Sequence, residues 1–119
     1  KEQHTKEELQ IQKLNQDILE LEINRKKEQY KNIVYNSHTL KASQLARDNL
    51  FKAYMLQKED NQKSILWLNS SDESINLNIE DIKNILLNLK KRDEKLYFKE
   101  AQEKLNIQSQ IKNLKTSGE

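Results

Sequence analysis

Apolar residues recur early in the chain at alternating steps of three and four, the spacing of a packed helix seam. This seam consists of Ile11, Leu14, Ile18 and Leu21. A second apolar stripe begins at Leu19 and lies about 90–120° around the helix, so the two halves of the helix face different neighbours. Thr5 and Glu8 fit a capping box. The pattern predicts a long first helix over roughly residues 5–36.

The middle of the chain predicts a second helix followed by a loop. Cap-forming residues at 36–39 precede an apolar set that indicates a helix over residues 39–60. The compact apolar patch at 65–68 is expected either to form a short helix or to extend the second one. The Ser- and Asp-rich residues at 70–74 then indicate a loop.

The last part of the chain predicts two helices. Asn78 and Asp81 fit a cap for a third helix, and the polar stretch KKRDEK then interrupts its apolar seam. Asp93 can cap a fourth helix over about 93–116. No residue between them is a hard helix breaker, so one continuous helix stays open. Two helices are preferred because four helices of usable length can close into a bundle. The final TSGE should fray.

The scarcity of turn-forming residues narrows the fold class. The 119-residue chain has no Pro and one Gly, Gly118, which argues against hairpins and Gly-rich phosphate loops. We therefore expect an all-α fold in a single domain over residues 1–119, a four-helix bundle with a long first helix and at most one short extra helix. Leu86 and Phe98 are expected in its core. Because such a bundle is closed, we expect a monomer.

Composition excludes several classes of function. Charged residues make up 34% of the chain, but the signs are mixed and the formal net charge is only +2, too small for generic binding to nucleic acid. No run of 18 apolar residues could span a membrane. There is no Cys, hence no thiol chemistry. The chain starts at Lys1 without a secretory pattern, so we expect an excised domain or mature fragment, with any signal peptide or lipid anchor upstream.

Candidate catalytic residues are few. His4 and His38 are the only histidines and lack metal-ligand spacing. Paired acids such as Glu7 and Glu8 lie in charge-rich stretches typical of solvated faces, and no nucleophile motif is present. The single Trp, Trp67, is expected to anchor a core or loop. The sequence therefore predicts no enzyme, no cofactor and no metal site.

One basic residue departs from the helical pattern. Arg25 occupies the position at which the first seam predicts an apolar residue, with Lys26 and Lys27 beside it. Lys104 lies between two apolar stripes near the end of the chain. In an up-down bundle both lie ~16 Å from the same end, so we hypothesise that Arg25 and Lys104 form one bipartite cationic site whose charged heads reach water.

These features resemble the C-terminal helical domain of the fibronectin-binding (Fbp-type) surface lipoproteins of Lyme-disease and relapsing-fever spirochaetes. The resemblance consists of the Lys/Asn/Ile-rich, Pro-free sequence, the long first helix and the closed bundle. Arg25 in EINRKKEQY and Lys104 in EAQEKLNIQ match two basic contact residues of that family. The resemblance implies a lipid-anchored domain on the outer cell surface that binds complement C1 subcomponent r. It would inhibit the classical complement pathway and so serve immune evasion, without binding fibronectin.

Two other functional classes remain open. The chain could be a structural coiled-coil or scaffold domain that acts by helix pairing, and it would then be an elongated oligomer rather than a monomer. The weakest alternative is a nucleic-acid-binding helical domain, because the chain does not interleave aromatic and basic residues.

Overall fold

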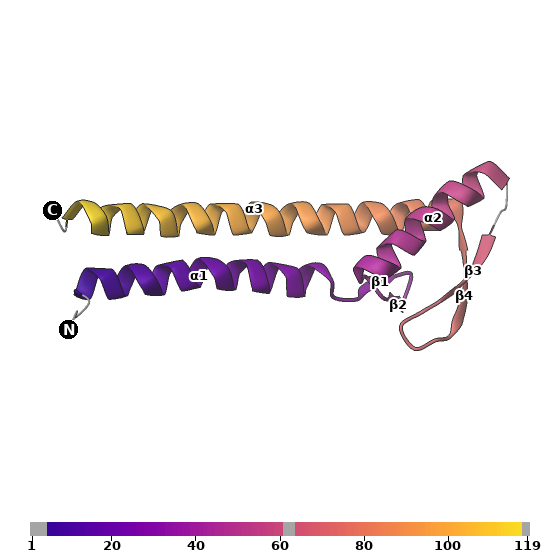
Figure 1. Ribbon diagram of the computed structural model, residues 1–119. Coiled ribbons are helices and arrows are strands. Elements are labelled where there is room, and N and C mark those ends of the chain that lie inside the picture. The colour runs from indigo at the N-terminus through magenta and orange to yellow at the C-terminus, as the bar shows by residue number, and fades with distance from the viewer. Residues whose placement is uncertain (1–4, 61–63, 118–119) are drawn as a thin grey trace. The chain divides into compact units, whose positions relative to one another are not determined.

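The computed structural model describes residues 5–60 and 64–117, which form three helices and two β-hairpins (Figure 1). The elements are α1 (Lys6–Gln29), β1 (Ile33–Tyr35), β2 (His38–Leu40), α2 (Gln44–Asp60), β3 (Ser64–Leu68), β4 (Ser74–Asn78) and α3 (Ile79–Ser117). The expected all-α four-helix bundle is therefore wrong. The described chain has one helix fewer than expected and two antiparallel sheets of two strands each.

The chain divides into two compact units. We call residues 28–94 the mixed unit, because it holds both hairpins and α2. The other, which we call the helical unit, comprises residues up to 27 and from 95 onward. It holds most of α1 and the second half of α3.

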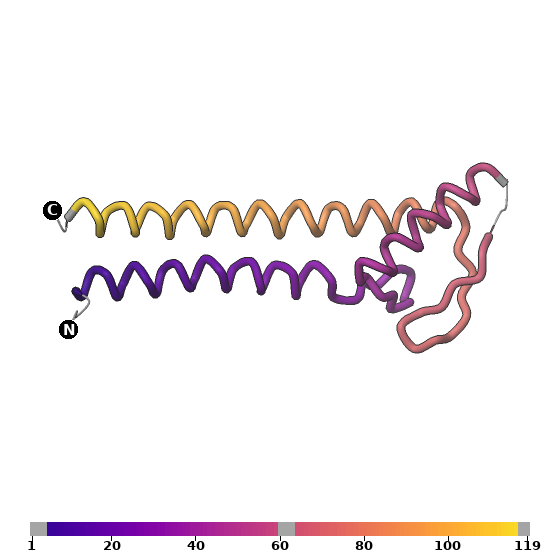
Figure 2. The backbone as a smooth tube through the Cα atoms, viewed as in Figure 1, coloured from indigo at the N-terminus to yellow at the C-terminus, as the bar shows by residue number. Residues whose placement is uncertain are grey.

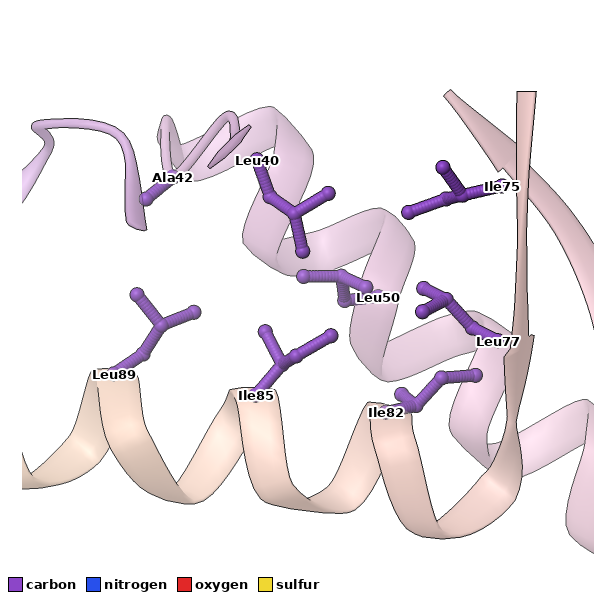
Figure 3. Packing of buried hydrophobic residues seen from close by; sticks show 8 residues of the cluster. All are labelled: Leu40, Ala42, Leu50, Ile75, Leu77, Ile82, Ile85 and Leu89. Atoms are coloured by element: carbon purple, nitrogen blue, oxygen red, sulfur yellow. The ribbon is translucent and has the colours of Figure 1, made fainter. Parts of the chain in front are cut away.

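Among the described residues, the buried apolar core lies in the mixed unit (Figure 3). Side chains from α2, β4 and the first turns of α3 meet there with residues at the end of the first hairpin. The buried members are Leu40, Ala42, Leu50, Ile75, Leu77, Ile82, Ile85 and Leu89. Leu86 packs against this cluster but is only partly buried. Trp67 also packs against it, as expected for an anchor residue.

The first hairpin falls where the sequence predicted helix. α1 ends at Gln29 rather than near residue 36, and β1 pairs with β2 so that Tyr35 lies opposite His38. The two residues between them, Asn36 and Ser37, have positive φ angles of 47° and 67°. Positive φ at both central residues is the geometry of a type I′ hairpin turn. The hairpin therefore forms without Gly, because Asn and, less readily, Ser can adopt the left-handed region.

The second hairpin replaces the helical segment expected at 65–68. β3 and β4 pair in antiparallel register, with Trp67 opposite Ile75. Figure 2 shows the backbone of these two paired segments. In β4, Ile75 and Leu77 are buried while the polar residues between and beside them are exposed. This alternation is the period-two pattern of a half-buried strand. The loop expected at 70–74 is present but ends one residue earlier, because β4 already begins at Ser74.

Two of the predicted helix starts, at Thr5 and at Asn78, agree with the hydrogen bonds. The Asp81 amide donates to Asn78 Oδ1 at 2.8 Å, and the Asn78 amide donates to Asp81 Oδ2 at 3.0 Å, which is a reciprocal capping box. At α1 the Glu8 amide donates to Thr5 Oγ1 at 3.1 Å. α2 instead begins at Gln44, after Ser43, whose hydroxyl caps it.

The preference for separate third and fourth helices is wrong, because α3 runs without interruption through the KKRDEK stretch. Asp93 is an interior helical residue rather than a cap, and its carboxylate pairs with Arg47. A polar stretch without Gly or Pro interrupts an apolar seam without interrupting backbone hydrogen bonding. Of the predicted frayed end, Gly118 and Glu119 lie outside the described residues.

Within the helical unit, α1 and the second half of α3 pair through partly buried seams. The α1 seam is the one predicted, Ile11, Leu14, Ile18 and Leu21, and the α3 seam carries Leu96, Ile107, Ile111 and Leu114. None of the apolar side chains described in this unit is buried, and its buried residue is polar, Glu100. Phe98, expected in the core, is 66% exposed.

Candidate interaction surface

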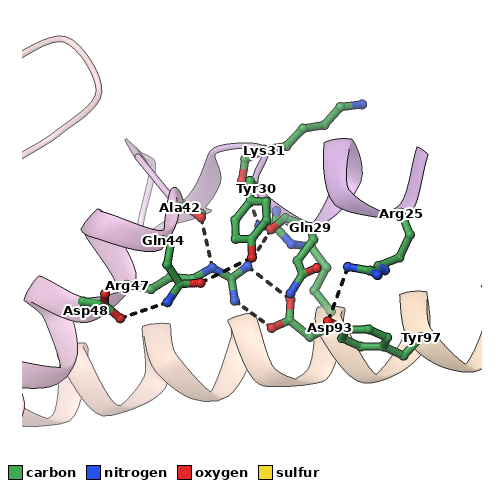
Figure 4. Close-up of polar contacts among 11 residues, drawn as sticks. Arg25, Gln29, Tyr30, Lys31, Ala42, Gln44, Arg47, Asp48, Asp93 and Tyr97 are labelled. Atoms are coloured by element: carbon green, nitrogen blue, oxygen red, sulfur yellow. Dashed lines mark hydrogen bonds and ion pairs between the residues drawn. The ribbon is translucent and has the colours of Figure 1, made fainter. Parts of the chain in front are cut away.

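The seam position occupied by Arg25 is matched by a carboxylate on the other helix. Arg25 Nε donates to Glu100 Oε2 at 3.1 Å. The guanidinium carbon of Arg25 lies 4.5 Å from the centre of the Tyr97 ring, and both side chains are drawn in Figure 4. The side chains of Arg25 and Glu100 are only 15% and 8% exposed. The cation is therefore held in the seam by a partner helix that supplies both an anion and an aromatic face.

Lys104 lies next to this pair. Its Nζ donates to Glu22 Oε1 at 2.8 Å and lies 3.6 Å from Glu100 Oε1. The bond from Lys104 lowers the pKa of Glu22 below its ordinary 4.5, and the bond to Glu22 raises the pKa of Lys104 above its ordinary 10.5. Glu100 thus lies between the two cations, and two cross-helix ion pairs set the register of α1 against α3.

The structure places the four candidate contact residues as follows. Arg25 and Lys104 come together at Glu100, on adjacent helices. Neither head is free in water, because each is paired and the Lys104 side chain is 27% exposed. Lys26 and Lys27 are exposed in the last turns of α1. In their paired state, Arg25 and Lys104 stabilise the helix pair more directly than they present charge to a partner.

A second feature of the helical unit is an exposed apolar face. Leu19 lies three residues before Glu22, and Ile23 directly follows it. On α3, Ala101 lies three residues before Lys104, and Leu105 directly follows Lys104. Leu19 and Ala101 therefore lie on the side of the pair that carries the Glu22–Lys104 bond. Ile23 and Leu105 each lie two residues from a seam position, so they point away from the partner helix.

We call the exposed stripe on α3 the apolar face and define it as Tyr97, Phe98, Ala101 and Leu105. Leu19 and Ile23 form a second exposed stripe on α1. Phe98, Ala101 and Leu105 follow the steps of three and four that are typical of helix pairing. The sequence pattern shows both stripes and predicts that they pack inside a bundle. The structure leaves them uncovered.

Two arginines organise the mixed unit at the end of α1. Arg47 forms a two-pronged pair with Asp93, at 2.6 and 3.1 Å, and also donates to the Gln29 carbonyl at 2.5 Å (Figure 4). Arg92 donates to the same carbonyl at 2.6 Å and to Lys31 O at 2.8 Å. Burial lowers the pKa of Arg92, and nearby Arg47 adds to the effect. These guanidiniums satisfy the carbonyls left free at the helix end, which is a structural role.

The described residues offer no further chemical centre. They contain no group of three or more His, Cys, Asp or Glu side chains that could hold a metal ion. His38 is exposed on β2, and His4 lies outside the described residues. No helix in the described part of the chain is long and apolar enough to cross a membrane.

Comparison with known proteins gives no match. The sequence matches no protein-family model, no curated protein and no solved structure. These comparisons therefore do not bear on the resemblance to the Fbp-type lipoproteins. That resemblance also included a closed four-helix bundle, which this chain does not form.

Proposed function

We propose that this chain is a protein-interaction domain that acts by helix pairing, without chemistry of its own. The observation that carries the proposal is the exposed apolar face on a helix pair whose register is already fixed by ion pairs. Contiguous apolar surface of this kind, bordered by charged groups, is typical of a binding site for another protein.

The energetics of the helical unit support the same function. A pair of helices can bury only one side of each helix, and the described part of this unit has no fully buried apolar side chain. An additional helix laid on the apolar face would remove several large side chains from water, each contributing about 1.5–3 kcal/mol when fully buried. The unit therefore gains stability from a partner with a complementary apolar stripe.

The test is binding of labelled amphipathic helical peptides, measured by fluorescence anisotropy. The peptides carry Leu at steps of three and four, and a control peptide carries Ser at those positions. We expect the Leu peptide to bind the wild-type chain and to bind Leu105→Lys at least about tenfold more weakly. Asn106→Lys is the matched control, because the neighbouring exposed residue points about 100° further around the helix. Equal binding of the Leu and Ser peptides would contradict the proposal.

A second candidate function is binding to complement C1 subcomponent r, which would place the parent protein on the outer cell surface as a lipoprotein. Two observations favour it: Arg25 and Lys104 lie together at Glu100, and Lys26 and Lys27 are exposed beside them. Because the first two are paired within the chain, the exposed lysines would make the first contact.

Surface plasmon resonance on immobilised subcomponent r tests this second function. The variants are Lys26→Ala/Lys27→Ala and Arg25→Ala/Lys104→Ala, and Lys6→Ala is the control because it is exposed at the far end of α1. Loss of binding in both double variants, with the control unchanged, would support the function. Absence of wild-type binding would leave only the helix-pairing proposal.

A further inference from the structure

We propose that the outer edge of β3 binds an extended peptide of another protein, which adds a third strand to the second hairpin. The peptide carries alternating apolar residues and one acidic residue that pairs with Lys41. This site lies in the mixed unit, so the inference goes beyond the helix pairing proposed for the apolar face and does not depend on it.

A groove of about 360 Å³ lies between β3 and the start of α2. β3 contributes Leu66, Trp67 and Leu68 to its lining, and α2 contributes Leu45 and Ala46. Consecutive residues of a strand point to opposite faces of the sheet. A groove that is lined by three consecutive residues therefore runs along the edge of β3 rather than over one of its faces.

The hydrogen bonding beside the hairpin turn indicates which backbone groups point to this edge. The Asn69 amide donates to the Glu73 carbonyl at 2.9 Å, so residue 69 bonds inward, toward the β4 side of the hairpin. Hydrogen-bonded residues alternate along an antiparallel ladder. On that alternation, the backbone N–H and C=O groups of Leu66 and Leu68 point outward, into the groove.

The outer edge has a backbone partner just beyond β3 but is open along β3 itself. The Ser70 amide, next in the outward series after Leu68, donates to the Thr39 carbonyl of β2 at 2.7 Å. Among the described residues, β3 pairs only with β4. Its sequence, Ser-Ile-Leu-Trp-Leu, also has no charged residue and no Pro, which are features that commonly protect an exposed edge from pairing. The edge can therefore accept another strand.

The side chains around the groove suit an apolar strand. Leu45, Leu66 and Leu68 are 70%, 69% and 56% exposed, although they come from two different elements. Trp67 adds an aromatic ring that is only partly buried. An added strand would cover the leucines with alternate side chains. Main-chain hydrogen bonds would then supply affinity, and the alternate side chains would supply specificity.

Charge favours an acidic peptide over a second copy of this chain. Lys41 lines the groove and is exposed, and no carboxylate is among the described residues that line it. A carboxylate of the partner would form an ion pair with Lys41, whereas a cation would be repelled. The β3 strand of a second copy has no acidic residue, so pairing of two β3 edges would leave Lys41 without a counter-charge.

The fluorescence of Trp67, the only Trp in the chain, reports binding at this groove. The probe is an acetylated peptide with one Glu followed by alternating Val and Thr, and a control peptide has Lys in place of Glu. Pairing over a few residues buries little surface, so we expect a dissociation constant in the micromolar to millimolar range. An unchanged spectrum at millimolar Glu peptide would overturn the proposal.

Backbone methylation separates strand addition from side-chain contact. One modified peptide carries N-methyl groups on its Val amides, and the other carries them on its Thr amides. Only alternate amides of a strand face its neighbour. One modified peptide should therefore bind at least about tenfold more weakly than the other, because it loses its main-chain hydrogen bonds. Equal affinities of the two modified peptides would overturn edge pairing.

A charge exchange tests the role of Lys41. Lys41→Glu should weaken binding of the Glu peptide by about threefold to tenfold and should strengthen binding of the Lys peptide. Lys83→Glu is the matched control, because Lys83 is exposed in α3 and is not among the residues that line the groove. Equal effects of the two substitutions would overturn the placement of the acidic residue beside Lys41.

A proline at Leu66 tests the edge itself. Leu66→Pro removes one outward N–H and leaves the bonds to β4 intact, so it should weaken binding about fivefold or more relative to Leu66→Ala. Circular dichroism checks that both variants fold. Equal binding by the two variants would contradict pairing at this edge. Self-association of the wild type that Leu66→Pro abolishes in sedimentation velocity would identify the occupant as a second copy and overturn the peptide assignment.

Discussion

Arg25 of α1 and Glu100 of α3 form an ion pair at the seam where the two helices meet, with both side chains largely covered. The seam of α1 predicts an apolar residue at the Arg25 position. At the same level, the seam of α3 carries the carboxylate of Glu100. Charged groups at seam positions cost stability but restrict register and orientation. The pair therefore accounts for the interrupted seam through helix alignment, without requiring a ligand.

Removing one partner of this pair should destabilise the helical unit more than removing both. We expect Glu100→Ala to lower the free energy of unfolding by about 2–4 kcal/mol, because a covered guanidinium loses its carboxylate. Arg25→Leu/Glu100→Leu should stay within about 1 kcal/mol of the wild type or exceed it, since Leu extends the apolar seam. Urea denaturation followed by circular dichroism measures both. A double variant less stable than Glu100→Ala would show that the pair is a net source of stability.

The Glu22–Lys104 ion pair should make stability depend on pH at both extremes. The pKa of Glu22 is below its ordinary 4.5 in the folded chain, so its contribution is complete above pH 4.5 and is lost as pH falls through the folded value. The pKa of Lys104 is above 10.5, so its contribution is complete below pH 10.5 and is lost as pH rises further.

Glu22→Gln tests this pH dependence. Between neutral pH and pH 3, roughly a unit below the ordinary carboxyl value, the wild type should lose more stability than Glu22→Gln, measured as the shift in urea midpoint. Glu20→Gln is the control, since this neighbouring carboxylate is exposed and not bonded to Lys104. Equal losses in all three proteins would show that the ion pair contributes nothing measurable.

Much of the helical part of this fold could be predicted from local patterns. The caps at Thr5 and Asn78 were found because a capping box involves residues only three apart. The α1 seam was found because its spacing repeats. The continuity of α3 across KKRDEK was not predicted. An apolar seam ends where the packing partner of the helix ends, whereas the helix itself can continue beyond that point.

The strands were missed because their signals were weak. The Ser-Ile-Asn-Leu-Asn segment at 74–78 alternates polar and apolar residues, but it was divided between a predicted loop and a predicted helix cap. The turn at Asn36 and Ser37 lacks the Gly that usually marks such turns. The candidate site could be predicted only in part. The apolar seams single out Arg25 and Lys104, but their pairing with Glu100 and Glu22 depends on tertiary contacts that the local pattern does not contain.

Substitutions at Ile85 and Phe98 should separate core from interaction surface. Ile85 is fully buried in the mixed unit, so Ile85→Ala should cost about 2–5 kcal/mol. Phe98→Ala should cost about 0.5 kcal/mol or less in dilute solution, because the ring is mostly exposed. Thermal denaturation at low protein concentration measures both. A large loss in Phe98→Ala under dilute conditions would restore Phe98 to the core of the single chain.

A single substitution in the turn of the first hairpin, Ser37→Gly, should raise the free energy of unfolding. Ser37 has a φ of 67°, where a side chain costs roughly 1–2 kcal/mol that Gly does not pay. Ser37→Gly also creates Asn-Gly, the preferred pair for a type I′ turn, so we expect a gain of about 0.5–1 kcal/mol after the added flexibility of the unfolded chain is subtracted. Thr39→Gly is the control: it places the same residue in β2 and should cost about 0.5–1 kcal/mol. Urea denaturation compares the two, and destabilisation by Ser37→Gly would contradict the left-handed conformation assigned to this turn.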